Sequence, residues 1–295
     1  MDWETQLIFI YDSVCKYFKQ DKENHLLRIS PNSNPIFTDE EAITIFIYGT
    51  LSIKNDIKTI HKFFSNHLKN WFPKLTKYEA FNRRLNFLSN KILNFAEYFF
   101  QIMPNFLNNN EKIIVVDSLP IMISTGYKSF RSKSAKNLCN KGYCASKNIH
   151  YYGVKLHLFA DRNEDKLAFP KHLSITKASV HDLTAVRGYL EEFNGYKIIG
   201  DKAYSDKDLK KELKNKNIEL HTPVKLSRSK KELSDDEKTY SGVISSMRQS
   251  IEIFFSWLIE KTNIQKASKV RSENGLLKHI FGRFAAALIL LKFNL

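Results

Sequence analysis

The sequence contains little cysteine and lacks any long hydrophobic run. Its three cysteines, Cys15, Cys139 and Cys144, are odd in number and scattered, which argues against a disulfide framework and favours a reducing cytoplasm. The longest apolar run near the C-terminus, residues 285–291, ends at Lys292 and is far shorter than the roughly 20 residues of a membrane-spanning helix. The N-terminus carries acids before a short apolar stretch, so we expect neither a signal peptide nor a membrane partner.

Internal repeats and low-complexity tracts are also absent. Cys139 and Cys144 have His150 and His157 nearby in the sequence, and both residue types bind zinc in other proteins. Their spacing matches no standard zinc pattern, so a zinc site is not expected.

Acidic residues are in short supply. The chain has 46 Lys and Arg against 31 Asp and Glu, which gives a formal net charge of +15. Such an excess favours an anionic partner, of which nucleic acid is the commonest. The length of 295 residues with 43% hydrophobic residues is enough for one large domain or two smaller ones.

The first part of the chain is predicted to be helical. Residues 1–105 show helical periodicity and little alternation of β-branched residues, so we expect an all-helical N-terminal domain over residues 1–110. Thr38 or Asp39 precedes an acidic turn and an apolar face, which is typical of a helix start. Residues 58–72 and 77–100 are predicted to form further helices.

Basic residues are concentrated in this helical region. Between Lys54 and Lys91 there are nine Lys or Arg and two acids. Two interpretations are open: a helical surface that is merely solvated, or a DNA-contacting module with Arg83 and Arg84 on an exposed face.

The pattern changes near residue 110, and residues 111–295 are predicted to form a second domain with a sheet. Strands are expected at residues 112–117, 150–161, 166–176, 196–201 and 218–224, and helices at 181–193, 205–216, 241–261 and 274–293. Loops are expected at 129–148 and at about 225–238. Three successive strands followed by alternating helices and strands predict a mixed five-stranded sheet flanked by helices, in the order of a ribonuclease H-like domain.

Two acids end predicted strands. Asp117 follows "KIIVV" and Asp201 follows "YKIIG". An Asp at a strand end is often only a turn former. If the two strands are parallel neighbours, however, the acids lie side by side and repel each other. A divalent cation such as Mg²⁺ removes that repulsion and binds through carboxylate oxygens and substrate phosphates, which suits phosphate-ester chemistry.

A third acid, Glu252, lies inside the predicted helix 241–261. One face of this helix is apolar: Ile244, Met247, Ile251, Phe254, Phe255 and Leu258. A narrow polar stripe consists of Ser245, Arg248, Glu252 and Ser256. Arg248 and Glu252 have the spacing of an ordinary solvated ion pair. Alternatively, the apolar face packs on the sheet and turns Glu252 toward the strand ends, with Arg248 binding a phosphate or orienting Glu252.

Five motifs in this order resemble the DDE transposases of bacterial insertion sequences. They are "IIVVDSLPI", "GYCASKNIHYYGVKLHLF", "SVHDLTAV", "IIGDKAYSD" and "MRQSIEIFFSWL". The most similar branch is insertion-sequence family nine-eight-two, whose helical region also resembles "KYEAFNRRLNFL". The resemblance extends from about residue 40 to the C-terminus, and its strength lies in the order of the five motifs.

The resemblance implies a metal-dependent catalytic domain. Asp117, Asp201 and Glu252 would be the three acids that bind two Mg²⁺ (or Mn²⁺) ions. Water would hydrolyse a phosphodiester at the end of the element, and the freed 3′-hydroxyl would attack target DNA. The resemblance further implies that the N-terminal helices bind the terminal inverted repeats, that the active complex is a homodimer or larger, and that the protein works at the nucleoid in the bacterial cytoplasm.

The chain departs from a broader transposase signature that places Tyr, Arg, Glu and Lys along the last catalytic helix. Ser245 stands at the Tyr position and Ile259 at the Lys position, with Lys261 two residues on. Arg248 and Glu252 fit. The departures put phosphate contacts by the flanking positions in doubt but not the metal ligands.

Further residues are candidates for contact with DNA. Lys155 and His157 would face the scissile phosphate from the second strand, and Lys202 and Tyr204 follow the second acid, where Tyr204 could equally be packed. Residues 124–147 contain six cations and no acid, among them Arg131 and Lys133, which suits phosphate contacts.

His181 and Asp182 in "SVHDLT" have two interpretations. They could support the metal ligands from behind, or they could cap a helix N-terminus, where Asp182 interacts favourably with the helix dipole. For the whole chain, two alternatives to a transposase remain: a ribonuclease H-like nuclease without strand transfer, and an inactive DNA-binding protein derived from a transposase.

Overall fold

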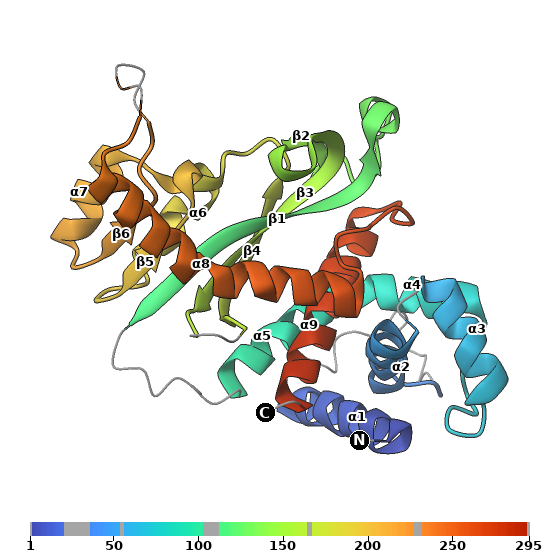
Figure 1. The fold of residues 1–295 in the computed structure, drawn as a ribbon. Coiled ribbons are helices and arrows are strands. Elements are labelled where there is room, and N and C mark those ends of the chain that lie inside the picture. Colours follow the sequence, from blue (N-terminus) through green and yellow to red (C-terminus); the bar gives the residue numbers. More distant parts are fainter. Residues whose placement is uncertain are drawn as a thin grey trace. The chain divides into compact units, whose positions relative to one another are not determined.

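The computed structural model consists of two compact units (Figure 1). It describes residues 2–20, 36–53, 56–102, 112–163, 167–226, 230 and 232–293. The first unit comprises Met1–Pro104 and Leu258–Leu295, and the second comprises Asn105–Trp257. We expected the boundary near residue 110 and the whole of 111–295 in the second domain, so the two divisions differ in where the C-terminal segment belongs.

Within its described residues, the regular elements of the first unit are all helices. Its helices are α1 (Trp3–Gln20), α2 (Asp39–Ser52), α3 (Ile57–His67), α4 (Tyr78–Phe87), α5 (Ser89–Ile102), the last turn of α8 (Asp235–Thr262) and α9 (Glu273–Phe293). Thr38 is the N-cap of α2: its hydroxyl accepts from Glu41 N, and Glu41 Oε2 accepts from Thr38 N. The predicted helix over residues 77–100 is in fact two helices, because α4 ends at Phe87 with Leu88 as its C-cap and α5 begins at Ser89.

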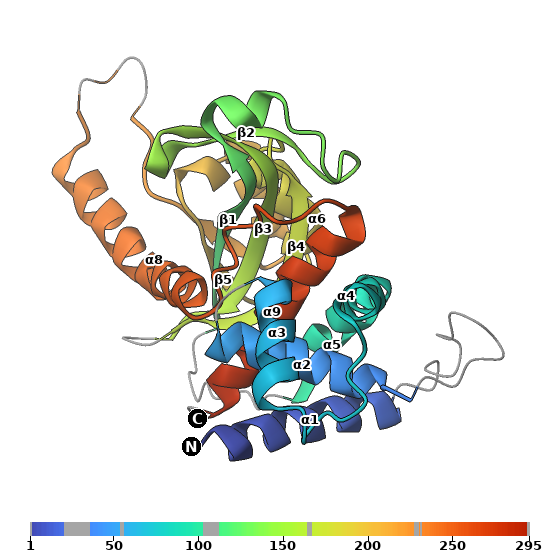
Figure 2. The ribbon, with the colours of Figure 1, turned by 90° about the vertical axis from the view of Figure 1, so that its right-hand side faces the viewer.

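The C-terminal helix α9 is the core of this unit. It packs against α2 and α5 (Figure 2), and its residues from Phe281 to Ile289 are all buried. Apart from Arg283, this stretch is apolar or glycine on every side, so it needs other helices around it, which is why α9 belongs to the helical unit. Among the described helices, α9 is also long and apolar enough over Glu273–Lys292 to cross a membrane, but 78% of its apolar stretch is buried in the protein. A buried core helix passes the same test.

The second unit is built on a mixed sheet. Its strands are β1 (Ile113–Thr125), β2 (Asn140–Cys144), β3 (Ile149–Asp161), β4 (Phe169–Lys177), β5 (Lys197–Ile199) and β6 (Glu219–His221). The strand order is β2-β3-β1-β5-β6, with β4 also paired to β3. β1 is antiparallel to β3 and parallel to β5, and β5 is parallel to β6.

The strand β2 was not predicted, because residues 140–144 lie in a segment that we expected to be a loop. β2 pairs with Ile149–Gly153 and β4 with Val154–Asp161, so the two strands occupy successive parts of the same edge of β3. Six strands contribute, but the sheet is five strands wide only at the end where β4 pairs with β3, because β5 pairs with β1 only at Ile113–Val115. The sequence of β2, Asn-Lys-Gly-Tyr-Cys, contains few residues with a high strand propensity and no clear alternation of polar and apolar residues, so it did not predict a strand.

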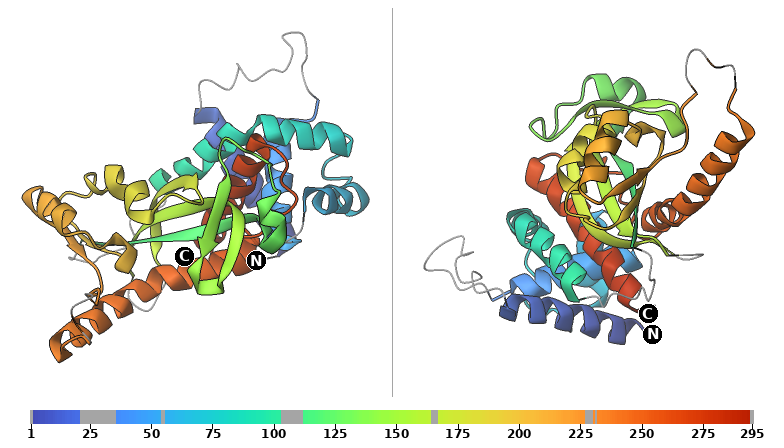
Figure 3. Two further views of the ribbon diagram at one scale, coloured as in Figure 1. Left: turned by 90° about the horizontal axis from the view of Figure 1, so that it is seen from above. Right: turned by 90° about the vertical axis from the view of Figure 1, so that its left-hand side faces the viewer.

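Helices cover both faces of the sheet. Short helices α6 (Asp182–Leu190) and α7 (Lys207–Asn215) pack on one face, where Ile114 and Val116 of β1 meet their apolar residues. The α8 helix lies on the opposite face (Figure 3). α8 begins at Asp235 with a capping box between Ser234 and Glu237, so the end of the predicted loop 225–238 is helical. The architecture is consistent with the predicted ribonuclease H-like fold.

Candidate active site

The parallel pairing of β1 and β5 places the two aspartates at equivalent positions along neighbouring strands. The last paired residues are Val115 and Ile199, and Asp117 and Asp201 each follow two positions later. Side chains alternate along a strand, so Asp117 projects on the face opposite Ile114 and Val116, which is the α8 face. The prediction that their strands are parallel neighbours is thus correct.

Contrary to our expectation, Asp117 does not end its strand. β1 continues to Thr125, with Asp117 opposite Leu158 of β3. Beyond Asp117 the strand is no longer paired with β5, and a strand with one free side accommodates a proline such as Pro120. The acid therefore lies on a strand that is held rigidly on one side and open on the other.

Asp201 has a structural role at the end of β5. Its carboxylate accepts a hydrogen bond from Ala203 N and caps the short 3₁₀ turn Lys202–Tyr204. The turn-former interpretation of this residue is therefore correct. It does not exclude a second role, because only one carboxylate oxygen bonds to Ala203.

The surroundings of Asp117 disfavour the ionised form of its carboxyl group. Burial, together with the negative charge of Asp201, raises its pKa from the usual 3.8 to about 6. Arg248 and a hydrogen bond of 2.8 Å from Ser118 N to Oδ1 oppose this rise without cancelling it. A buried carboxylate whose ionised form is disfavoured, with a second acid beside it, is an arrangement that a bound cation stabilises.

Arg248 and Glu252 of α8 complete the cluster. Arg248 Nη2 lies 3.0 Å from Asp117 Oδ2 and 3.3 Å from Glu252 Oε1, so its guanidinium bridges the two acids. The Arg248 side chain is 14% exposed and that of Glu252 is 55% exposed. Within the described ranges, no three His, Cys, Asp or Glu side chains lie close enough together to hold a metal ion. Glu252 and Asp117 are thus linked through their shared ion pairs with Arg248 and not by a direct contact.

Three polar side chains form a separate group on β3 and α6. Lys155 Nζ lies 3.0 Å from Asp182 Oδ1 and donates to Val180 O. His157 is fully buried, contacts Thr176 Oγ1 at 2.8 Å, and has its pKa lowered to about 4 by burial and by the charge of Lys155. A neutral, buried imidazole cannot face a scissile phosphate, so this prediction for His157 is wrong, and Lys155 is engaged with Asp182.

His181 is the N-cap of α6, because its Nδ1 accepts from Leu183 N at 3.3 Å. The capping interpretation is correct for this residue. Asp182 lies in the first turn and pairs with Lys155, which anchors the start of α6 to β3.

Lys202 and Tyr204, which follow the second acid, differ in exposure. Lys202 is exposed, whereas Tyr204 is 1% exposed and packs in the core with α6 and α7. A Cβ on Gly200 would lie 2.9 Å from the Tyr204 ring, so Gly200 is needed for the ring to pack beneath the strand end. Tyr204 therefore packs and is not placed to contact DNA.

The two arginines of the helical unit also differ. Arg83 is exposed, as expected. Arg84 forms a two-pronged ion pair with Asp39, and its side chain is 16% exposed. The prediction that Arg84 lies on an exposed face is wrong, because sequence spacing could not show a partner that is 45 residues away.

A basic and aromatic surface lies at the far end of β1. Tyr127, Phe130 and Tyr143 are exposed by half or more, Arg131 stacks over Tyr127 at 4.9 Å, and Lys141 stacks over Phe130 at 4.9 Å. Exposed rings beside cations are typical of surfaces that bind nucleic acid. Lys133 is exposed there too, while Cys139 and Cys144 are buried.

We expect the cations of this surface to contribute to DNA affinity. Lys128 and Lys136 are exposed in the same segment as Lys133. Replacing these three lysines by Gln should make the plot of log K against log salt less steep, by about 0.9 for each lysine that contacts a phosphate. Fluorescence anisotropy of a labelled duplex over a salt series measures the slope.

The matched control replaces three exposed lysines of α7, Lys207, Lys211 and Lys214, by Gln. The net charge changes by the same amount, so a general electrostatic effect would appear in both variants. Equal slopes for the two variants would exclude a specific role for the basic surface.

The chain is similar to a known family. A family model described as a transposase DDE domain matches residues 107–273, which is more than half of the chain and includes Asp117, Asp201 and Glu252. No curated protein and no solved structure matches the chain significantly. A DDE domain implies a catalytic transposase that binds DNA, and DDE transposases generally use divalent metal ions. The chain belongs to the family of transposases with a DDE domain.

Proposed function

We propose that this protein is the DNA transposase of an insertion sequence, of the branch known as family nine-eight-two. It hydrolyses a phosphodiester at each end of the element and joins the freed 3′-hydroxyl to target DNA. The observation that carries the proposal is the level placement of Asp117 and Asp201 on adjacent parallel strands, with Arg248 and Glu252 of α8 beside Asp117.

The donor set suits a hard divalent cation. Asp117, Asp201 and Glu252 offer only oxygen atoms as ligands. The raised pKa of Asp117 shows that its ionised form is unfavourable, and a bound cation would offset this cost. These three residues would hold two Mg²⁺ (or Mn²⁺) ions. Such ions, when bound, stabilise the attacking and leaving oxygens of the phosphodiester.

Arg248 is proposed as a positioning residue. Its guanidinium neutralises Asp117 and holds Glu252 at the edge of the site, so Glu252 must move toward the two aspartates before it can become a ligand. Glu252 is more than half exposed, so this movement meets little steric resistance. Once released, the guanidinium suits a phosphate oxygen of the DNA.

The partner is DNA. In this proposal the N-terminal helices hold the terminal inverted repeats, and the basic surface of the sheet unit contacts the DNA backbone. Bringing two ends together requires at least a homodimer in the active complex. The place of action is the nucleoid in the bacterial cytoplasm.

A strand-transfer assay with Mg²⁺ tests this function. The substrate is labelled DNA that carries the inverted repeats flanking the gene, together with a supercoiled target plasmid. A transposase yields cleaved ends and joined products, a nuclease yields nicks without joining, and an inactive DNA-binding protein only shifts the DNA. Binding without cleavage at any divalent ion concentration would contradict the proposal.

A further inference from the structure

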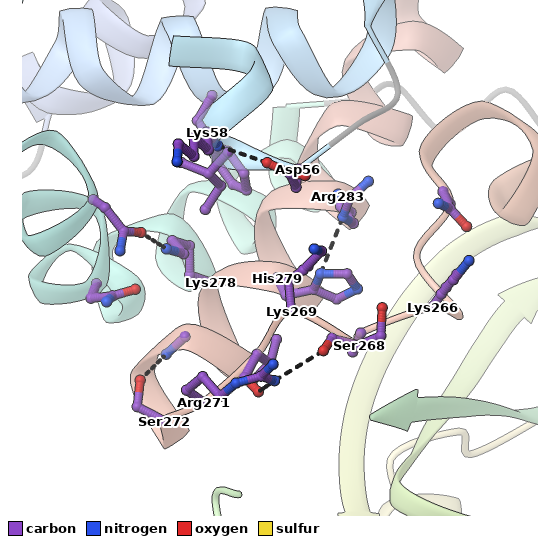
Figure 4. Close-up of a pocket in the computed structure, with 18 of the residues that line it drawn as sticks. Asp56, Lys58, Lys266, Ser268, Lys269, Arg271, Ser272, Lys278, His279 and Arg283 are labelled. Atoms are coloured by element: carbon purple, nitrogen blue, oxygen red, sulfur yellow. Dashed lines mark hydrogen bonds between the residues drawn. The ribbon is translucent and has the colours of Figure 1, made fainter. Parts of the chain in front are cut away.

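The helical unit contains a cavity with an unusual charge. Its volume is about 540 Å³, and it is formed by the start of α3, by α4, by the loop that follows α8 and by α9 (Figure 4). Six cations line it: Lys58, Lys266, Lys269, Arg271, Lys278 and Arg283. We call this cavity the basic pocket. One carboxylate, Asp56, lines it, and Asp56 already caps α3 by accepting from Lys58 N and Thr59 N.

Lys278 is the most informative of these cations. It is 3% exposed, and its ammonium group donates to Asn82 Oδ1 at 2.9 Å. No carboxylate among the described residues pairs with it, and burial lowers its pKa to about 7. A buried ammonium without a counter-ion is costly, so an anionic ligand in the basic pocket would supply the missing partner.

Neighbouring groups reinforce the preference for an anion. Arg283 is 6% exposed and is held in place by the carbonyl oxygen of Thr262 and by His279 Nδ1, at 3.3 Å from its Nε. The N-terminus of α9 also lies at the pocket, where Ser272 Oγ accepts from Gly275 N. A helix N-terminus adds partial positive charge to the side-chain cations.

The basic pocket is larger than a phosphate group needs. Its volume falls within the range of about 300–1,000 Å³ that is typical of sites enclosing small organic ligands. Asn86 lines it too, and Asn86 Oδ1 is buried without a hydrogen-bond partner in the described parts of the chain. A phosphate oxygen only accepts hydrogen bonds and cannot satisfy an acceptor. The exocyclic amine of a base can, and Asn is a common partner of base edges.

We propose that the basic pocket binds one unpaired nucleotide of a DNA strand, with its phosphate at Lys278 and its base at Asn82 and Asn86. The backbone of an intact duplex stays on the protein surface, whereas Lys278 and Arg283 are nearly inaccessible from outside. A nucleotide at a strand end or displaced from its pair can enter, and the unstacking cost is smallest for a base that is already unpaired. The inference rests on the proposed function, because it assigns the DNA of that function to this pocket.

The experiment compares three DNA ligands that share one arbitrary duplex sequence. The first is blunt, the second carries one unpaired nucleotide at an end, and the third carries an abasic unit there. Binding is measured by fluorescence anisotropy in EDTA, so that cleavage does not occur. We expect the wild type to bind the unpaired nucleotide at least about tenfold more tightly than the blunt or abasic ligand.

Variants then locate the effect. Lys278→Met, which keeps the side chain long and removes its charge, and Lys269→Gln, at the exposed rim, should lower the preference for the unpaired nucleotide while affinity for the blunt duplex changes less than about twofold. The matched control is Lys62→Met on the exposed side of α3, outside the pocket, which should retain the preference. Circular dichroism verifies that each variant is folded.

Competition identifies the chemistry and the source of the ligand. A free deoxynucleoside monophosphate should displace the unpaired-nucleotide ligand at concentrations at which inorganic phosphate does not. Equal competition by phosphate would overturn the nucleotide assignment. Strong binding of the free nucleotide without any preference among the DNA ligands would overturn the assignment to DNA.

Failure of the inference can be told from failure of the proposed function. An unchanged preference in Lys278→Met and Lys269→Gln, with strand transfer intact in the wild type, would overturn the pocket assignment alone. Loss of the preference in both variants, with no cleavage by the wild type, would support the pocket and overturn the transposase.

Discussion

Asp201→Asn is expected to abolish DNA cleavage while leaving DNA binding unchanged. The substitution removes a carboxylate charge from the proposed metal site but leaves an oxygen that can still accept from Ala203 N, so the turn after β5 is preserved. Losing a group that only supports a metal ligand costs about 10- to 100-fold, so losing a ligand should cost more than 100-fold. Cleavage of labelled end DNA with Mg²⁺ and gel-shift affinity without it are the two measurements.

The control is Asp208→Asn. Asp208 is exposed in the first turn of α7, so its substitution makes the same change in charge away from the strand ends. It should cleave at the wild-type rate. Cleavage by Asp201→Asn within tenfold of the wild type would remove Asp201 from the site.

Asp117→Asn should stabilise the protein at neutral pH even as it removes activity. The pKa of Asp117 is about 6 in the folded state, above its usual 3.8, so the folded state favours the protonated acid. Stability is then lost as the pH rises from about 4 to about 6, and the loss persists above that window. A shift of about two pKa units corresponds to roughly 3 kcal/mol, which the neutral Asn should recover at pH 8 and not at pH 4.

Urea unfolding at the two pH values measures this difference, and Asp208→Asn should show no comparable gain. Adding Mg²⁺ at pH 8 should raise the unfolding midpoint of the wild type, because the ion binds the folded state, and should do so much less for Asp117→Asn. Lower stability of Asp117→Asn at pH 8 would mean that its ion pair with Arg248 outweighs the cost of burying its charge.

Much of the fold was predictable because local signals agreed with the final packing. The apolar runs before Asp117 and Asp201 predicted their strands, and the apolar face of α8 predicted a helix packed on a sheet, with Ile251 and Phe254 fully buried. Thr38 or Asp39 followed by acids predicted a helix start, and the structure confirms it with Thr38 as the N-cap of α2.

What could not be predicted depended on distant partners. The burial of His157 follows from β4 pairing along β3, and the pairing of Arg84 follows from Asp39 on another helix. The Lys278 site needs Asn82, which lies 196 residues away in the sequence. Periodicity indicates which face of a helix is polar, but it does not indicate which polar group meets that face.

Gly200 and Tyr204 have a consequence for reading related sequences. The glycine leaves room for the tyrosine ring beneath the end of β5, and both are required by packing whether or not the site is active. A relative that has lost catalysis through mutation of the aspartate could therefore still carry the surrounding Gly and Tyr. In a survey of genomes, the Gly and Tyr of this motif would therefore identify the fold. Only the aspartate between them would distinguish an active transposase from an inactive one.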